Sequence, residues 1–127
     1  IAPNGVLIVH DCNPTTAAAE TPVKSSITEV LEKAKRGEIP GWADIWNGDV
    51  WKAILRLQSE RDDINICTLD VDWGVAVVTR QANANKLTYS TNNIEMFSYK
   101  DLEHNRVKWL NLKEPKYLDI LVQGLKR

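Results

Sequence analysis

The stretch that decides the fold is residues 5–14, with the sequence GVLIVHDCNP. Residues 6–9 are apolar without a break, which is typical of a strand covered on both faces rather than of a half-exposed strand. Pro14 cannot donate to a central sheet ladder, so we expect the strand to stop before it and to release a loop. Three polar residues then fall at the carboxyl end of the strand: His10, Asp11 and Asn13.

Downstream of this strand, hydrophobic periodicity predicts the other elements. Apolar residues at helical spacing predict helices over residues 22–36, 50–60, 99–110 and 116–125. Two β-branched runs, residues 64–69 and 75–79, predict strands, and their short connection makes them antiparallel.

Local signals refine these boundaries. Asp49 is placed to cap the helix over residues 50–60, and Ser98 with Asp101 has the spacing of a capping box. The polar segment 81–97 shows no period and predicts an exposed loop.

The order of strand, two helices, two strands and a helical tail predicts an α/β fold with an open sheet. We expect a partial α/β domain over residues 1–80, a polar loop over 81–97 and a helical extension over 98–127. Ligands of open α/β sheets bind beyond the carboxyl ends of the strands. This rule puts the polar residues after the first strand at the functional edge.

Composition narrows the function classes. The 127 residues are 43% hydrophobic and 26% charged, as in ordinary globular domains, and the formal net charge is −1. A balanced charge gives no field toward phosphate backbones, and no apolar run reaches the roughly 20 residues of a membrane helix. We therefore expect no nucleic acid or membrane partner and a cytoplasmic location. Cys12 and Cys67 are too few for a disulfide framework, so we expect free thiols.

Residues 5–14, GDVWKAI at 48–54 and DVDWGV at 70–75 together resemble class I S-adenosylmethionine-dependent methyltransferases. The similarity is to their C-terminal half, in particular to a bacterial group with an HDCNP and GDVWK pattern. It implies a Rossmann-like methyltransferase sheet in which the chain holds the fifth, sixth and seventh strands, the seventh antiparallel to the rest. The tail from Ser98 is similar to a helical extension found in some members.

The resemblance also implies what the chain does not carry. The Gly-rich turn and the acidic residue that hold S-adenosylmethionine in this family would lie before Ile1, and the six glycines of the chain are scattered singly. We therefore expect a fragment that alone neither binds the cofactor well nor transfers methyl groups. Its partners would be the upstream half of the same protein or a second copy in a homodimer.

His10 and Asp11 are the predicted catalytic residues. A histidine of near-neutral pKa can take a proton from a hydroxyl, and an aspartate can orient it. The alternative is that His10 packs in the sheet and Asp11 caps the loop. In related catechol-type enzymes an adjacent Asp-Asn pair binds a divalent cation, so Asp11 is also the candidate metal ligand. Cys12 stands where the asparagine would be, which argues against a metal.

Three further residues are predicted to bind the acceptor: Asn13, Trp46 and Asp49. An aromatic surface near carboxylates suits a sugar or another small hydroxylated metabolite. The structural alternative for Asp49 is the helix cap.

The first functional hypothesis is thus the acceptor half of an O-methyltransferase. The second is a non-catalytic interaction or dimerisation module, since a lone apolar strand leaves a sheet edge to be covered. A nicotinamide enzyme on a similar sheet is a third.

Overall fold

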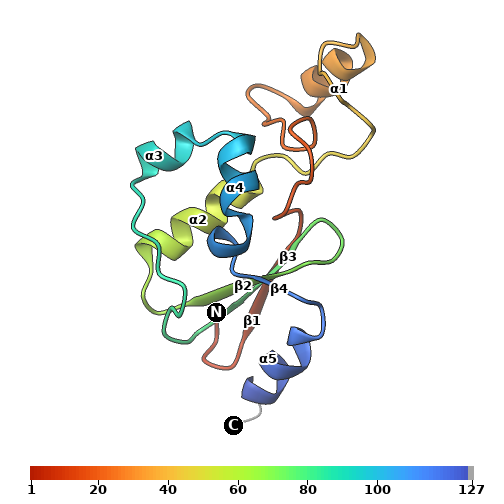
Figure 1. Cartoon of the computed structure of the whole chain (residues 1–127). Coiled ribbons are helices and arrows are strands. Elements are labelled where there is room, and N and C mark those ends of the chain that lie inside the picture. Colours follow the sequence, from red (N-terminus) through yellow and green to blue (C-terminus); the bar gives the residue numbers. More distant parts are fainter. Residues whose placement is uncertain (126–127) are drawn as a thin grey trace.

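The computed structural model describes residues 1–125 and is built around one sheet (Figure 1). Within them the strands are β1 (Val6–Val9), β2 (Asn65–Leu69), β3 (Val75–Thr79) and β4 (Leu112–Lys113). The helices are α1 (Ile27–Lys35), α2 (Val50–Glu60), α3 (Thr91–Met96), α4 (Tyr99–Trp109) and α5 (Tyr117–Leu125). The predicted α/β class is confirmed in this general form.

The strands form one open, mixed sheet in the order β1-β3-β2-β4. β3 is antiparallel to both neighbours, with Ile8 opposite Val77 on one side and Cys67 opposite Val77 on the other. Hence β1 and β2 run in the same direction, and their carboxyl ends lie at the same edge of the sheet. The predicted β2–β3 hairpin is confirmed.

The turn of this hairpin, residues 70–74, needs unusual backbone conformations. Asp72, Trp73 and Gly74 all have positive φ angles, and Gly74 lies at +90°. A Cβ on Gly74 would stand 2.5 Å from both the backbone nitrogen and the Cβ of Asn13. Only glycine therefore lets the hairpin turn approach the loop that follows β1.

One face of the sheet carries the main core, under α2 and α4. Trp51 of α2 stacks on Trp109 of α4, with ring centroids 6.3 Å apart, and both side chains are buried. Gln58 is fully buried between these helices, donating to the Trp109 carbonyl and accepting from Asn85 at 2.8 Å. The core is thus built jointly from the segments predicted as residues 1–80 and 98–127.

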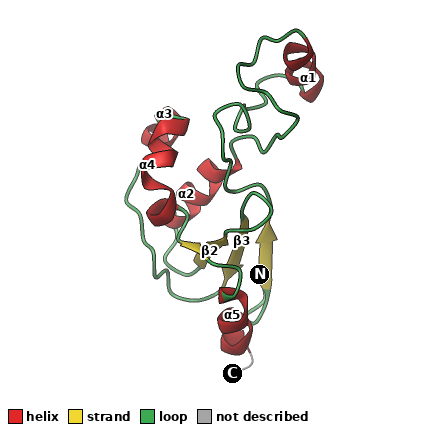
Figure 2. Ribbon diagram, turned by 45° about the vertical axis from the view of Figure 1, so that its right-hand side comes forward, coloured by secondary structure: helices red, strands yellow, loops and turns green. Residues whose placement is uncertain are grey.

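The opposite face is covered by α5 over the centre of the hairpin. Tyr117 and Leu121 of this helix pack on a small buried cluster of Cys67, Leu69 and Val77. The predicted last helix is therefore present, and it forms a thin second layer below the sheet (Figures 1 and 2).

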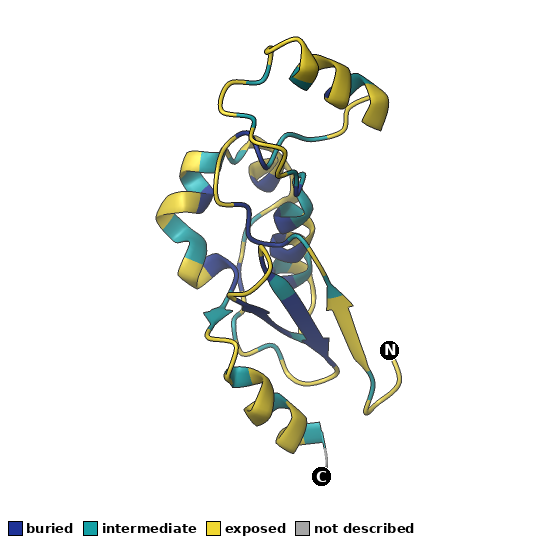
Figure 3. Ribbon diagram, turned by 90° about the vertical axis from the view of Figure 1, so that its right-hand side faces the viewer, coloured by how far each residue is buried: buried dark blue, intermediate teal, exposed yellow. Residues whose placement is uncertain are grey.

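β1 differs from its prediction as a strand covered on both faces. It is the edge strand, and Val6, Leu7 and Ile8 are 40%, 45% and 55% exposed (Figure 3). Within the described residues only β3 pairs with β1, so part of the apolar surface of β1 lies outside the core.

Between β1 and α2 the chain makes a long excursion that carries α1 at its tip. It stands away from the sheet, beyond the end of β1 (Figures 1 and 2), and most of α1 is exposed (Figure 3). α1 begins at Ile27 rather than at residue 22, because the Ser26 hydroxyl accepts from the Glu29 backbone N–H and caps it there.

Of the other local predictions, some are confirmed and others are wrong. α2 has the predicted bounds, but Asp49 at its N-cap makes no side-chain capping hydrogen bond, so that expected role is wrong. The capping box of Ser98 and Asp101 is confirmed. The segment expected as an exposed polar loop contains α3 and buries Leu87 and Ile94 in the main core.

The contact between Gly74 and Asn13 gives a direct test of the fold. We expect Gly74→Ala to lower the free energy of unfolding by about 2 to 5 kcal/mol, through left-handed strain plus overpacking. Gly48→Ala is the matched control, because Gly48 also has a positive φ but a Cβ there meets nothing within 4 Å. It should cost only about 1 to 2 kcal/mol. Urea unfolding followed by tryptophan fluorescence measures both, and equal losses would contradict this packing.

Candidate functional site

The candidate site lies on the rim loop, residues 10–14, at the carboxyl end of β1. The hairpin turn holds this loop by two backbone hydrogen bonds: the Cys12 N–H donates to the Gly74 carbonyl at 3.0 Å, and the Asn13 N–H donates to the Trp73 carbonyl at 2.7 Å. Asp11, just before them, has a φ of +64°, which is costly for a residue with a side chain. The loop is thus fixed in a strained conformation that turns it away from the sheet.

His10 and Asp11 form a polar pair on this loop. His10 Nδ1 lies 3.0 Å from Asp11 Oδ1, and the two side chains are 57% and 36% exposed. Asn47, from the loop before α2, donates through Nδ2 to the same Asp11 oxygen at 2.9 Å. Since Asp11 engages Nδ1, the other ring nitrogen, Nε2, is the one that can accept a proton from a ligand.

Asn47 was missed by the sequence reasoning. It is buried, and its Oδ1 has no hydrogen-bond partner within residues 1–125. In the sequence it precedes Gly48 and indicates only a turn. Its contact with Asp11 joins residues 36 positions apart, and no local pattern predicts that.

Asn13 has a different role from the predicted one. The side chain is only 4% exposed, and its Oδ1 accepts from Arg106 of α4. Its Nδ2 lies 3.5 Å from Asp70 Oδ1. Because both ends of the amide are engaged inside the protein, Asn13 structures the rim loop in this conformation instead of facing a substrate.

The Cys12 thiol, on the same loop, is expected to be unreactive. The pKa of Cys12 is raised to about 11, chiefly by burial; a backbone hydrogen bond with Ala76 opposes this rise, and the Asp11 charge adds a smaller increase. A thiol with so high a pKa is protonated at neutral pH and is a poor nucleophile. Cys67 is buried too, and burial raises its pKa. Both cysteines are free, as predicted.

A second carboxylate, Glu20, lies behind Asn47 and was also missed. The backbone N–H groups of Asn47 and Gly48 both donate to the carbonyl of Ala19, the residue before Glu20. Glu20 accepts from the indole N–H of Trp51 at 3.2 Å. Burial raises the pKa of Glu20, with smaller opposing effects of the Trp51 hydrogen bond and the Lys52 charge, while the Asp49 charge raises it slightly. No sequence pattern singles out Glu20, because it lies in a segment of small and polar residues without periodicity.

Trp46 and Asp49, the other predicted binding residues, are both partly exposed near this region. The Trp46 indole N–H donates to the Thr21 carbonyl at 2.8 Å, and its ring lies 6.0 Å from that of Trp42. The indole N–H of Trp46 is therefore engaged within the segment between β1 and α2, and only the Trp46 ring remains to contact a ligand. Asp49 interacts electrostatically with Glu20.

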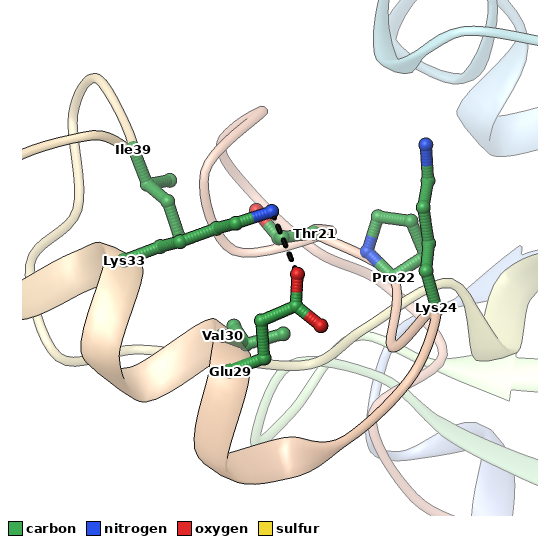
Figure 4. Close-up of a pocket in the computed structure, with 7 residues that line it drawn as sticks. All are labelled: Thr21, Pro22, Lys24, Glu29, Val30, Lys33 and Ile39. Atoms are coloured by element: carbon green, nitrogen blue, oxygen red, sulfur yellow. Dashed lines mark ion pairs between the residues drawn. The ribbon is translucent and has the colours of Figure 1, made fainter.

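A hollow of about 310 Å³ opens in the excursion rather than at the rim loop (Figure 4). It lies between α1 and the neighbouring loops, and Lys33 and Glu29 form an ion pair 3.0 Å long across it. The lining residues are Thr21, Pro22, Lys24, Glu29, Val30, Lys33 and Ile39. Neither His10 nor Asp11 is among them, so this hollow is separate from the polar pair.

The donor set of the rim loop does not fit a metal ion. Asp11 is the predicted ligand, but its Oδ1 already contacts His10 and Asn47. Among residues 1–125, no three His, Cys, Asp or Glu side chains are grouped so that they could hold a cation.

Within residues 1–125 the glycines are spread over separate elements of the fold. Gly37, Gly41, Gly48 and Gly74 each serve a separate turn with positive φ, and Gly124 lies within α5. A Cβ on Gly5 would meet Ile1 and Ala2 at 3.0 to 3.1 Å, so this glycine serves a local turn. No glycine-rich cradle is formed in residues 1–125.

Comparison of the chain with protein-family models, with curated proteins and with solved structures found no match in any of the three. In the described part of the chain, no helix has the length and apolar character needed to cross a membrane.

The raised pKa of Glu20 predicts a pH-dependent stability difference. Because the folded chain binds this proton more tightly than the unfolded chain, the contribution of Glu20 is fully present below the ordinary carboxyl pKa of 4.5 and is lost as the pH rises through the folded value. Glu20→Gln keeps an acceptor for Trp51 without the buried charge. It should therefore be more stable than the wild type at pH 7, and the gain should vanish below pH 4.5.

Urea unfolding of both proteins between pH 3.5 and 7.5 measures this difference. Glu103→Gln, at an exposed position of α4, is the control and should show no such trend. A gain for Glu20→Gln that is the same at every pH would contradict the assignment.

Proposed function

We propose that this chain is the acceptor-side half of an S-adenosylmethionine-dependent O-methyltransferase that acts on a hydroxyl of a sugar or another small metabolite. The observation that carries the proposal is the His10–Asp11 pair, 3.0 Å apart and partly exposed at the carboxyl end of β1. A general base must be accessible to its substrate and held in orientation; the exposure of His10 and its contact with Asp11 support this role.

The sheet topology supports the same proposal. The resemblance implies that the last of three strands is antiparallel to the others, and β3 is antiparallel to β1 and β2, which share one direction. This arrangement supports the proposal of a Rossmann-like methyltransferase half, as does the position of the His10–Asp11 pair after β1, since open α/β sheets bind ligands beyond the carboxyl ends of their strands.

In the proposed reaction S-adenosylmethionine would supply the methyl group, and its carbon–sulfur bond would break with the electron pair leaving on the sulfur of the demethylated product. His10 Nε2 would take the proton of the acceptor hydroxyl as its oxygen bonds to the methyl carbon. Asp11 holds the imidazole through Nδ1 and stabilises the positive charge that develops on the ring. Asn47 holds Asp11 from the other side. Most of the rate would come from alignment of the reactants by this fixed loop.

The methyl donor would be held outside this chain, since the described residues form no cradle for it. The acceptor would approach from the exposed side of His10. The partly exposed residues Glu20, Trp46 and Asp49 lie on the segments that meet at Asn47, which contacts Asp11. Carboxylates beside an aromatic ring suit a polyhydroxylated compound, because they accept from its hydroxyls while the ring covers an apolar face.

A second candidate function is an interaction or dimerisation module. The exposure of β1 favours it, because Val6, Leu7 and Ile8 present apolar side chains and an open ladder edge without the charges or proline that usually protect such edges. In the enzyme proposal the same edge is covered by the cofactor-binding half. Both proposals thus require a partner at β1 and differ in the use of His10.

The histidines provide a matched test of the enzyme proposal, because the chain has only two, His10 and His104. In the longest form of the gene product, His10→Gln should lower kcat/KM for methyl transfer about 10²- to 10⁴-fold, as expected for loss of a general base. A radiolabelled methyl-transfer assay measures the rates.

His104→Gln is the control, since His104 is exposed on α4 and contacts only a backbone carbonyl of its own helix, that of Lys100. It should leave the rate unchanged. An active enzyme whose rate survives His10→Gln would contradict the role given to His10.

A further inference from the structure

Arg106 connects α4 to the rim loop. One guanidinium nitrogen, Nη1, donates to the Asn13 side-chain oxygen and to the Pro14 carbonyl, the latter at 2.7 Å. The other, Nη2, donates to the Tyr99 hydroxyl at 3.1 Å, and the guanidinium lies 5.8 Å from the centre of the Tyr99 ring. A residue 93 positions away in the sequence thus binds two consecutive residues of the loop.

The acceptors of Arg106 are buried. Asn13 is 4% exposed and Pro14 is among the most fully buried residues of the protein. Buried acceptors that lose their donor destabilise the folded conformation, so removing Arg106 would favour a loop conformation in which both acceptors meet water. The loop can respond locally, because it has no regular secondary structure.

The strained residue Asp11 depends on such contacts. A positive φ at a residue with a side chain persists only where the surroundings over-determine it. The hairpin turn holds the loop from one side through Gly74 and Trp73, and Arg106 holds it from the other. These two supports act on Cys12, Asn13 and Pro14, immediately after the His10–Asp11 pair.

We propose that Arg106 is a positioning residue, which fixes the rim loop from α4 and so holds His10 and Asp11 in their paired geometry. Arginine suits this task because its planar fork donates in fixed directions to Asn13, Pro14 and Tyr99 at once. The proposal assigns the helical tail a role in the site as well as in the core. Its catalytic consequence rests on the proposed function, whereas its structural part does not.

Amide hydrogen exchange of this chain tests the structural part without any activity. Arg106→Gln should speed exchange of the Cys12 and Asn13 amides at least tenfold more than that of the core amides of α2. Lys108→Gln is the matched control, on the same helix at an exposed position, and should change neither. Arg106→Lys keeps the charge but not the fork, so its effect should be intermediate. If Arg106→Gln fails to fold, Arg106→Lys and Tyr99→Phe provide the same comparison.

The catalytic part is measured on the longest form of the gene product. With kcat expressed per folded enzyme, so that general destabilisation is corrected for, Arg106→Gln should lower kcat at least tenfold with little change in KM for S-adenosylmethionine. Exchange at Cys12 and Asn13 that rises only in step with the α2 amides, or not at all, would overturn the proposal. If the wild-type gene product transfers no methyl groups, the proposed function fails, and the exchange data still decide whether Arg106 fixes the loop.

Discussion

The close approach of Gly74 to Asn13 is the contact on which the rest of the structure depends. A side chain on residue 74 would overlap the backbone of the rim loop, and the same approach brings the Cys12 and Asn13 N–H groups onto the carbonyls of Gly74 and Trp73. These hydrogen bonds continue the pairing of β1 with β3 beyond the end of the strand. They set where the loop leaves the sheet and therefore where His10 and Asp11 lie.

The N-terminal and C-terminal halves of the chain pack together as one unit. β3 bridges β1 and β2, α2 and α4 share one core through Trp51 and Trp109, and Arg106 returns from α4 to the rim loop. The site is thus built by segments that are far apart in the sequence. The excursion with α1, by contrast, adds a hollow and a pair of tryptophans but little to the core.

Local signals predicted the elements well, because α2, β3 and the capping box at Ser98 depend on residues within one turn or one strand. The position of His10 and Asp11 at the end of β1 followed from the apolar run 6–9 and from Pro14. The roles of Asn13, Asn47 and Arg106 could not be predicted, since each depends on a partner 36 to 93 residues away. Asp49 made no cap despite a favourable position, and β1 proved to be an exposed edge, because burial depends on which strand lies next to it.

We propose that this chain supplies the acceptor side of a methyltransferase and that the cofactor is held elsewhere. Isothermal titration of S-adenosylmethionine, and of its demethylated product, into this chain and into the longest form of its gene product tests this proposal. We expect binding to the longer form only. Absence of binding to both would contradict the claim and leave the interaction module at β1 as the function, and tight binding to this chain alone would contradict the separation of the two sides.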